Sequence, residues 1–433
     1  MRTSPFIKIT PDVPHRSDLI YSNGSIIKGL VGVDPQSSLL LSNVSISLKG
    51  RITTRIDEGS GEHKRIYRQK NYLFSISNTL RNGGPLVREA TTWRFEFQFP
   101  ETVQPYPQEN EIIPGDGFVH LPGHPLPPTW ESSDRWSQIS YYLEVFAYDT
   151  TAVFRNEIKN RLPLQFRPSR SIENPLPIPY YRKTPHHFES YKLDPEYGTQ
   201  HLSFREMARK VFTASEPKPR LSFHVRSSIP QQAIPGASFP IMIGLEHDPS
   251  STTAPMIPPI YLQHLHVRLT NSYQTRVQAR LFLKVRNHAQ MYSKKIVILN
   301  RGFINLAMGE RMEMIELLPA DYLKVPENLL PTFSSYTVAG NYMIKVTATI
   351  RVLDKFFELE LGKVPLLVHP KEYTVQNPSL EIGMPDAEPS SSSRQQVTPH
   401  QGRQEEEAPL EEPLPPYTSL DPNKSRVGPP LVF

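Results

Sequence analysis

The stretch Val44-Ser45-Ile46-Ser47-Leu48-Lys49-Gly50 decides the fold class, because apolar and polar side chains alternate along it. Successive side chains of a β-strand point to opposite faces, so this period of two predicts a strand with one buried and one solvated face. The alternation returns at residues 94–99, where three phenylalanines alternate with Arg, Glu and Gln before Pro100. The chain is therefore expected to bury the faces of sheets.

The first 170 residues predict one β-sandwich. Further strands are expected at residues 25–33, 139–148 and 162–166, while residues 101–130 are dense in Pro and Gly and should form a loop. Several strands with Gly- and Pro-rich breaks and little helical periodicity are typical of a sandwich. We therefore expect an immunoglobulin-like sandwich over residues 20–170, preceded by a flexible N-terminus at residues 1–19.

A second sandwich is expected over residues 220–370. Alternating or apolar stretches there predict strands at residues 221–225, 239–245, 265–269, 279–285, 295–299, 342–352 and 363–368. Residues 171–219 predict a Pro-rich linker with one short helix at residues 203–212, where Ser203 and Glu206 have capping-box spacing. Residues 371–433 are rich in Ser, Glu and Pro and are expected to be a disordered tail. The predicted fold class is thus all-β, with two tandem sandwiches.

Composition excludes some chemistry and leaves the surface charge open. The 433 residues include no Cys, which rules out disulfides, Cys-based zinc sites and a Cys nucleophile. Residues 371–433 hold ten acidic and five basic side chains, a charge of −5, and since the whole chain carries +5 the preceding body carries +10. Such a body can favour phosphates, anionic lipid or acidic peptides, although a mixed, solvated surface gives the same balance. There is no dense run of basic residues of the nucleic-acid-binding kind.

Two proline–tyrosine strings are candidate ligands for WW domains. Leu414-Pro415-Pro416-Tyr417 lies in the acidic tail, and its prolines favour the polyproline II conformation that aromatic-lined grooves bind. Pro258-Pro259-Ile260-Tyr261 fits the PPxY pattern more literally. Tyr261 is expected to begin a strand, however, which would fix its ring in a sheet. We therefore favour the string that ends at Tyr417.

A cluster of cations is a candidate site for phosphorylated or acidic segments of a cargo protein. Its members surround the second and third predicted strands, where a solvated hairpin is the alternative interpretation: Arg51, Arg55, Lys64, Arg65, Arg68 and Lys70. His264 and His266 share a strand face, but no third ligand is evident and Arg268 follows, so a solvated face is the better interpretation. No catalytic motif, cofactor-binding residue or metal site is predicted, which argues against an enzyme.

The order of these pieces resembles the arrestin superfamily, in particular its α-arrestin or arrestin-related trafficking adaptor branch. Residues 21–31 look like the family's Y-x-x-G-x-x-I-x-G-x-V track, and residues 95–100 and 126–131 resemble its FxFxxP and LPPSF segments, with Trp130 for Phe. The other stretches that resemble the family are residues 44–50, 139–147, 234–236, 342–352 and 364–368. The resemblance covers residues 20–370; the long linker and the insertion near residues 101–125 depart from it.

This resemblance implies a non-enzymatic adaptor. Members of the family bind membrane transporters or receptors as cargo and present them, through proline–tyrosine motifs, to the WW domains of HECT-type ubiquitin ligases, so that the cargo is ubiquitinated and endocytosed. It also implies a cytoplasmic protein that is peripheral at the plasma membrane or endosomes. The first residues, Met1 to Phe6, lack the apolar stretch of a signal peptide, so none is expected, and no run approaches ~18 apolar residues. The alternative is an arrestin-like scaffold in signalling or retromer-type trafficking that recruits no ligase.

Overall fold

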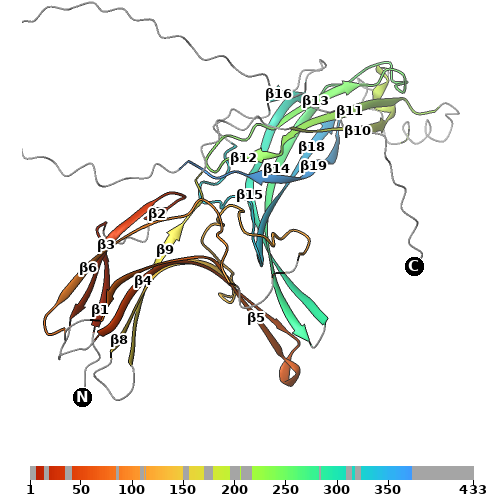
Figure 1. The fold of residues 1–433 in the computed structure, drawn as a ribbon. Coiled ribbons are helices and arrows are strands. Elements are labelled where there is room, and N and C mark those ends of the chain that lie inside the picture. Colours follow the sequence, from red (N-terminus) through yellow and green to blue (C-terminus); the bar gives the residue numbers. More distant parts are fainter. Residues whose placement is uncertain are drawn as a thin grey trace, which may run out of the picture. The chain divides into compact units, whose positions relative to one another are not determined.

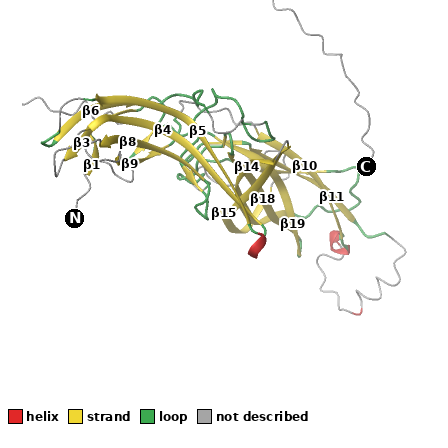
Figure 2. Cartoon of the chain, turned by 60° about the horizontal axis from the view of Figure 1, so that its bottom comes forward, coloured by secondary structure: helices red, strands yellow, loops and turns green. Residues whose placement is uncertain are grey.

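The computed structural model describes residues 6–13, 19–34, 41–83, 87–107, 112, 114–149, 156–169, 179–195, 205, 217–281, 284–308, 315–316 and 323–372. The elements with bounds in this part of the chain are nineteen strands and two short 3-10 helices, η1 (Gly61–His63) and η2 (Tyr191–Leu193). Figure 2 shows the dominance of strands directly. The prediction of an all-β protein is confirmed.

Two sheets form the first sandwich (Figure 1). The smaller sheet has the order β1 (Phe6–Pro11), β3 (Ile26–Asp34), β6 (Thr91–Gln98). The larger sheet has the order β2 (Ile20–Tyr21), β9 (Asn156–Phe166), β8 (Gln138–Asp149), β4 (Leu41–Glu58), β5 (Arg65–Asn82), and β7 (Trp130–Glu131) also pairs with β8. All of these pairings are antiparallel except that of β2 with β9.

The alternation that predicted the strands fills the core of this sandwich. Ile46 and Leu48 of β4 are completely buried in one hydrophobic cluster with Phe95 and Phe97 of β6. An aromatic group completes the cluster: the ring centroids of Phe99 and Phe166 lie 5.1 Å apart, and its other members are Phe74 and Tyr141. Since both sheets contribute to one cluster, their apolar faces pack against each other.

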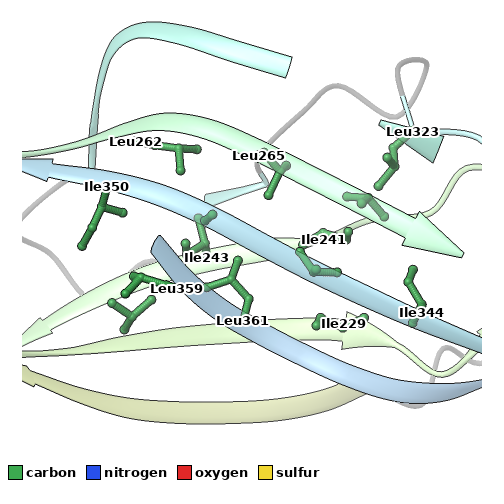
Figure 3. Close-up of a cluster of buried hydrophobic side chains, with 14 of the residues drawn as sticks. Ile229, Ile241, Ile243, Leu262, Leu265, Leu323, Ile344, Ile350, Leu359 and Leu361 are labelled. Atoms are coloured by element: carbon green, nitrogen blue, oxygen red, sulfur yellow. The ribbon is translucent and has the colours of Figure 1, made fainter. Parts of the chain in front are cut away.

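The second sandwich also has two sheets. One has the order β10 (Pro179–Glu189), β11 (Arg220–Pro230), β13 (Met242–His247), β16 (Ile315–Glu316). The other has the order β12 (Gln232–Ala233), β19 (Lys355–Val368), β18 (Val338–Val352), β14 (Ile260–Leu281), β15 (Lys284–Met308), with β17 (Phe333–Ser334) paired to β18. Figure 3 shows its core, where Ile229 and Ile243 of the first sheet face Leu265, Ile344 and Leu361 of the second.

Three sequence-based boundaries were wrong. Strand β1 lies in the N-terminal segment that we expected to be flexible, and its Ile7 and Ile9 are buried against the first core. Strand β10 lies in the expected linker and pairs along its length with β11, so the second sandwich begins before residue 220. The stretch at residues 279–285, expected to be one strand, instead includes the end of β14 and the start of β15, whereas residues 265–269 lie within β14 as expected. The helix expected at residues 203–212, apart from Arg205, and residues 373–433 of the tail lie outside the described residues.

The two sandwiches touch through specific side chains. Tyr336 and Val338 of the second sandwich belong to the buried cluster of the first. The backbone N–H of Gln278 donates to Oε1 of Gln69 at 2.8 Å. Arg276 of β14 is only 2 % exposed, and its guanidinium carbon lies 4.5 Å from the ring centroid of Phe118 in the first sandwich.

Candidate functional site

A sheet face of the first sandwich collects basic side chains on the side opposite the core. Along β4 the even-numbered residues from Leu48 to Ile56 are buried, so the odd-numbered residues point away from the core. The register of β4 with β5 and β8, and of β8 with β9, then places cations from three strands, β4, β5 and β9, on this face. We call it the basic face and define it by Lys49, Arg51, Arg55, Arg68, Lys70, Lys159 and Arg161.

Glu144 lies at the centre of the basic face and is shared by three cations. Nζ of Lys49 lies 2.6 Å from its Oε2, Nζ of Lys159 lies 2.9 Å from its Oε1, and Nε of Arg161 also donates to Oε1. The carboxylate is only 2 % exposed although it stands on the open side of the sheet. Burial alone would raise the pKa of Glu144, but the hydrogen bonds from these cations outweigh it and lower the pKa to about 2. Three cations around one carboxylate leave an excess of positive charge.

Aromatic rings line the same face. The guanidinium carbons of Arg51 and Arg161 lie 5.3 Å and 5.1 Å from the ring centroid of Tyr142, and Lys49 and Lys159 lie over Phe146. Such contacts hold long basic side chains flat against the sheet by cation–π attraction. Nε of Arg51 is buried and has no hydrogen-bond partner among the described residues.

Asp57 neutralises the other end of the basic face. Arg55 donates to both oxygens of Asp57, at 2.8 Å and 3.0 Å, and Nζ of Lys64 lies 2.7 Å from Oδ2. The hydrogen bond from Arg55 is the main reason that the pKa of Asp57 falls to about 2. Arg55 and Lys64 also lie over the ring of Trp136, at 4.3 Å and 5.3 Å. The excess of cations is therefore greatest around Lys49, Lys159 and Arg161.

The structure brings together four of the six predicted cations: Arg51, Arg55, Arg68 and Lys70. Arg65 pairs with Glu58, one register position away, so it belongs to the opposite face. Lys64 lies in the turn before β5 and reaches only the end of the face, where it pairs with Asp57. Sequence reasoning missed Lys49, Lys159, Arg161 and Glu144. The polar residues at every second position of β8 and β9 carried a signal, but only strand pairing shows that they share a face with β4.

The string Pro258-Pro259-Ile260-Tyr261 lies at the start of β14. Pro258 and Ile260 are buried, and Tyr261 pairs with Ala307 of β15 and Arg351 of β18. The guanidinium carbon of Arg351 lies 5.1 Å from the Tyr261 ring centroid. The sheet therefore holds Ile260 and Tyr261 on both sides, while Pro258 and Pro259 lie just before the strand. Leu414, Pro415, Pro416 and Tyr417 lie outside the described residues.

The described residues offer little for other chemistry. Within them no group of three or more His, Asp or Glu side chains could hold a metal ion. His264 and His266 stand on β14 at the register positions of Thr349 and Thr347 of β18. Nor does any helix in the described ranges have the length and apolar character needed to cross a membrane.

The basic face is suited to binding anions. Guanidinium and ammonium groups form charge-assisted hydrogen bonds with phosphate and carboxylate oxygens, and the exposed ring of Trp136 can cover an apolar part of a peptide. No protein-family model matches the chain, and no curated protein matches it.

Proposed function

We propose that the protein is a non-enzymatic adaptor of arrestin type. Its first sandwich binds acidic or phosphorylated segments of membrane transporters or receptors. Its tail string Leu414-Pro415-Pro416-Tyr417 recruits the WW domains of a HECT-type ubiquitin ligase, so that the bound cargo is ubiquitinated and sorted by endocytosis. The adaptor works as a cytoplasmic protein, peripheral at the plasma membrane or endosomes, where an anionic lipid surface adds to the attraction.

The observation that supports cargo binding is the concentration of cations on the basic face. Lys49, Lys159 and Arg161 surround a single carboxylate, and Arg51 has a buried Nε with no partner in the described part of the chain. An incoming phosphate or carboxylate gains charge-assisted hydrogen bonds from the ammonium and guanidinium groups of this face. Charge complementarity of this kind speeds encounter and selects acidic partners.

The placement of Tyr261 supports the choice of the tail string for the ligase. A WW domain takes its ligand in the polyproline II conformation and needs both the proline and tyrosine rings accessible. Because residues 258–261 lead into a strand with neighbours on both sides, they do not meet that requirement in the folded protein. The string at residues 414–417 remains as the proline–tyrosine ligand of this chain.

A pair of tyrosine substitutions tests the ligase half of the proposal. We expect Tyr417→Ala to abolish binding of the full-length protein to a WW-domain array, because the tyrosine ring that fills a pocket of the WW domain is lost. Endocytosis of the cargo should stop as well. Tyr261→Phe, which keeps the ring in the sheet, should change neither. Isothermal titration with isolated WW domains measures the first effect. Equal binding by the wild type and the Tyr417→Ala variant would contradict the proposal and favour a scaffold that recruits no ligase.

The cargo half has a separate test. The double variant Arg51→Glu, Lys70→Glu should weaken binding of a phosphorylated cytoplasmic cargo peptide, while WW-domain binding stays unchanged. Lys8→Glu is the matched control, because Lys8 is exposed on β1 of the smaller sheet, away from the basic face. Unchanged peptide binding by the double variant would remove the basic face from the proposal and leave the ligase half standing.

A further inference from the structure

Strand β15 ends its sheet and carries an unusual balance of charge. Among the residues that the structure describes, β14 is the strand paired with it, and β15 stands last in the order β12-β19-β18-β14-β15 (Figure 1). The twenty-five residues of β15 include five Lys or Arg and no Asp or Glu, and β14 contains no acidic residue either. An edge strand presents unpaired backbone N–H and C=O groups on its outer side, which can pair with another extended segment.

The part of β15 best suited to such pairing is residues 293–297. Its register with β14 is regular from residue 284 to Val297, and a register shift follows directly after Val297. On the other side, Tyr292 is engaged with the first sandwich through its hydroxyl, which donates to Asp134 at 2.9 Å. Five residues lie between these two limits, close to the usual length of a β-strand. They form what we call the β15 edge.

The side chains of the β15 edge define what could pair with it. Lys294 and Lys295 are exposed, Val297 is 57 % exposed, and Ile296 packs only partly against the core of the second sandwich. Further along the strand, Ile304 is 97 % exposed. Natural edge strands often carry lysines that discourage self-pairing, because two such edges repel each other. The same lysines attract an extended segment of opposite charge.

We propose that the β15 edge binds an extended acidic segment of a partner protein by β-strand addition. Backbone hydrogen bonds to residues 293–297 provide affinity, carboxylates of the partner pair with Lys294 and Lys295, and its apolar side chains cover Ile296 and Val297. A second copy of this chain is a poor occupant, since it would bring the same cations together. The site is separate from the basic face and does not depend on the proposed adaptor function.

Two peptides of equal charge test this proposal on the full-length protein. One is a synthetic eight-residue peptide in which pairs of glutamates alternate with pairs of valines, because Lys294 and Lys295 point to opposite faces of the strand. In the other peptide prolines replace the valines and remove backbone donors. We expect the first to bind and to protect amides of residues 293–297 in hydrogen–deuterium exchange, and the second to bind at least about tenfold more weakly. Equal binding of the two peptides, or protection on the basic face instead, would overturn the proposal.

Reversing the charges of the β15 edge gives a second test of the proposal. Lys294→Glu with Lys295→Glu should reduce binding of the glutamate–valine peptide at least about tenfold. The matched control is Lys355→Glu with Lys363→Glu, two exposed positions on β19 of the same sheet, which should leave binding unchanged. Undiminished binding of the peptide to the β15 variant would contradict the proposal. So would a dimer of the protein, seen by light scattering, that dissociates when the peptide is added, because a second copy of the chain would then occupy the edge.

Discussion

At the scale of single residues, Glu144 illustrates how a charge can be buried on the open side of a sheet. Three cations from β4 and β9 donate to its two oxygens, so each oxygen has a partner. The lowered pKa of Glu144 means that the folded state holds the ionised form more tightly than the unfolded chain does. Folding is therefore stabilised above the ordinary value of 4.5, and this contribution is lost as the pH falls towards about 2.

The isosteric substitution Glu144→Gln tests this network. We expect it to lower the free energy of unfolding at pH 7 by about 1–2 kcal/mol, less than for a fully buried pair, because Lys159 and Arg161 are partly exposed and solvent screens them. The difference from the wild type should shrink as the pH is lowered from 5 to 2.5. Urea unfolding at both pH values measures it. A difference that is the same at both would show that the carboxylate charge contributes nothing.

At the scale of elements, Gly50 shows how closely β4 approaches the aromatic group of the first core. A Cβ atom at this position would lie 2.7 Å from the Phe74 ring and 2.9 Å from the Tyr141 ring, and both rings are buried. The register of β4 with β5 also shifts at this point, because Gly50 pairs with Phe74 and Arg51 with Tyr72, which leaves Leu73 of β5 as the extra residue. The absence of a side chain is what allows this packing.

Gly50→Ala should therefore overpack the first core and lower the free energy of unfolding by about 1–3 kcal/mol. Gly32→Ala is the matched control within the same sandwich, because a Cβ atom there would meet only Thr92 Cγ2 at 3.8 Å. Thermal and urea unfolding of the two variants should differ accordingly. If Gly50→Ala is as stable as the wild type, the rings of Phe74 and Tyr141 can move aside for the new methyl group at no cost, which would contradict the prediction.

At the scale of the whole molecule, within the residues that the structure describes, Arg276 is a residue at which the two sandwiches touch. Its guanidinium carbon lies 4.5 Å from the ring centroid of Phe118 of the first sandwich, and Nη1 and Nη2 are buried without a hydrogen-bond partner among the described residues. Desolvation lowers the pKa of Arg276, as expected for a buried cation. A Cβ atom on Gly115 would lie 2.2 Å from Nη1, so Arg276 and Gly115 fit each other only because position 115 is glycine.

A double-mutant cycle measures this contact. Arg276→Met removes a buried, incompletely paired charge and should leave the free energy of unfolding unchanged or raise it by about 1–3 kcal/mol. Gly115→Ala should destabilise the wild type, and the cost should largely disappear in the Arg276→Met background, because the flexible Met side chain can yield to the new methyl group. Additive effects of the two substitutions would show that residues 115 and 276 do not meet.

Features of the fold that depend on residues close together in the chain could be predicted from the sequence, whereas features that depend on distant residues could not. The strands at residues 44–50 and 94–99 were evident because alternation is a local consequence of strand geometry. Strand β10 was missed because it lies at the edge of its sheet, where Pro185 is tolerated and only Phe188 is buried. Four cations of the candidate site were foreseen, while its central carboxylate, Glu144, was not.

The sequence by itself determined that this protein buries two sets of sheet faces, since side-chain period and Gly- and Pro-rich breaks act within a few residues of each other. Only the tertiary structure decided which charges meet, because β4 and β8 pair across about a hundred residues of chain and their register places Lys49 beside Glu144. Tertiary structure also decided that Ile260 and Tyr261 pair with strands on both sides while β15 ends the same sheet. Strand order depends on which long-range pairings bury the most apolar surface, and that balance belongs to the whole fold.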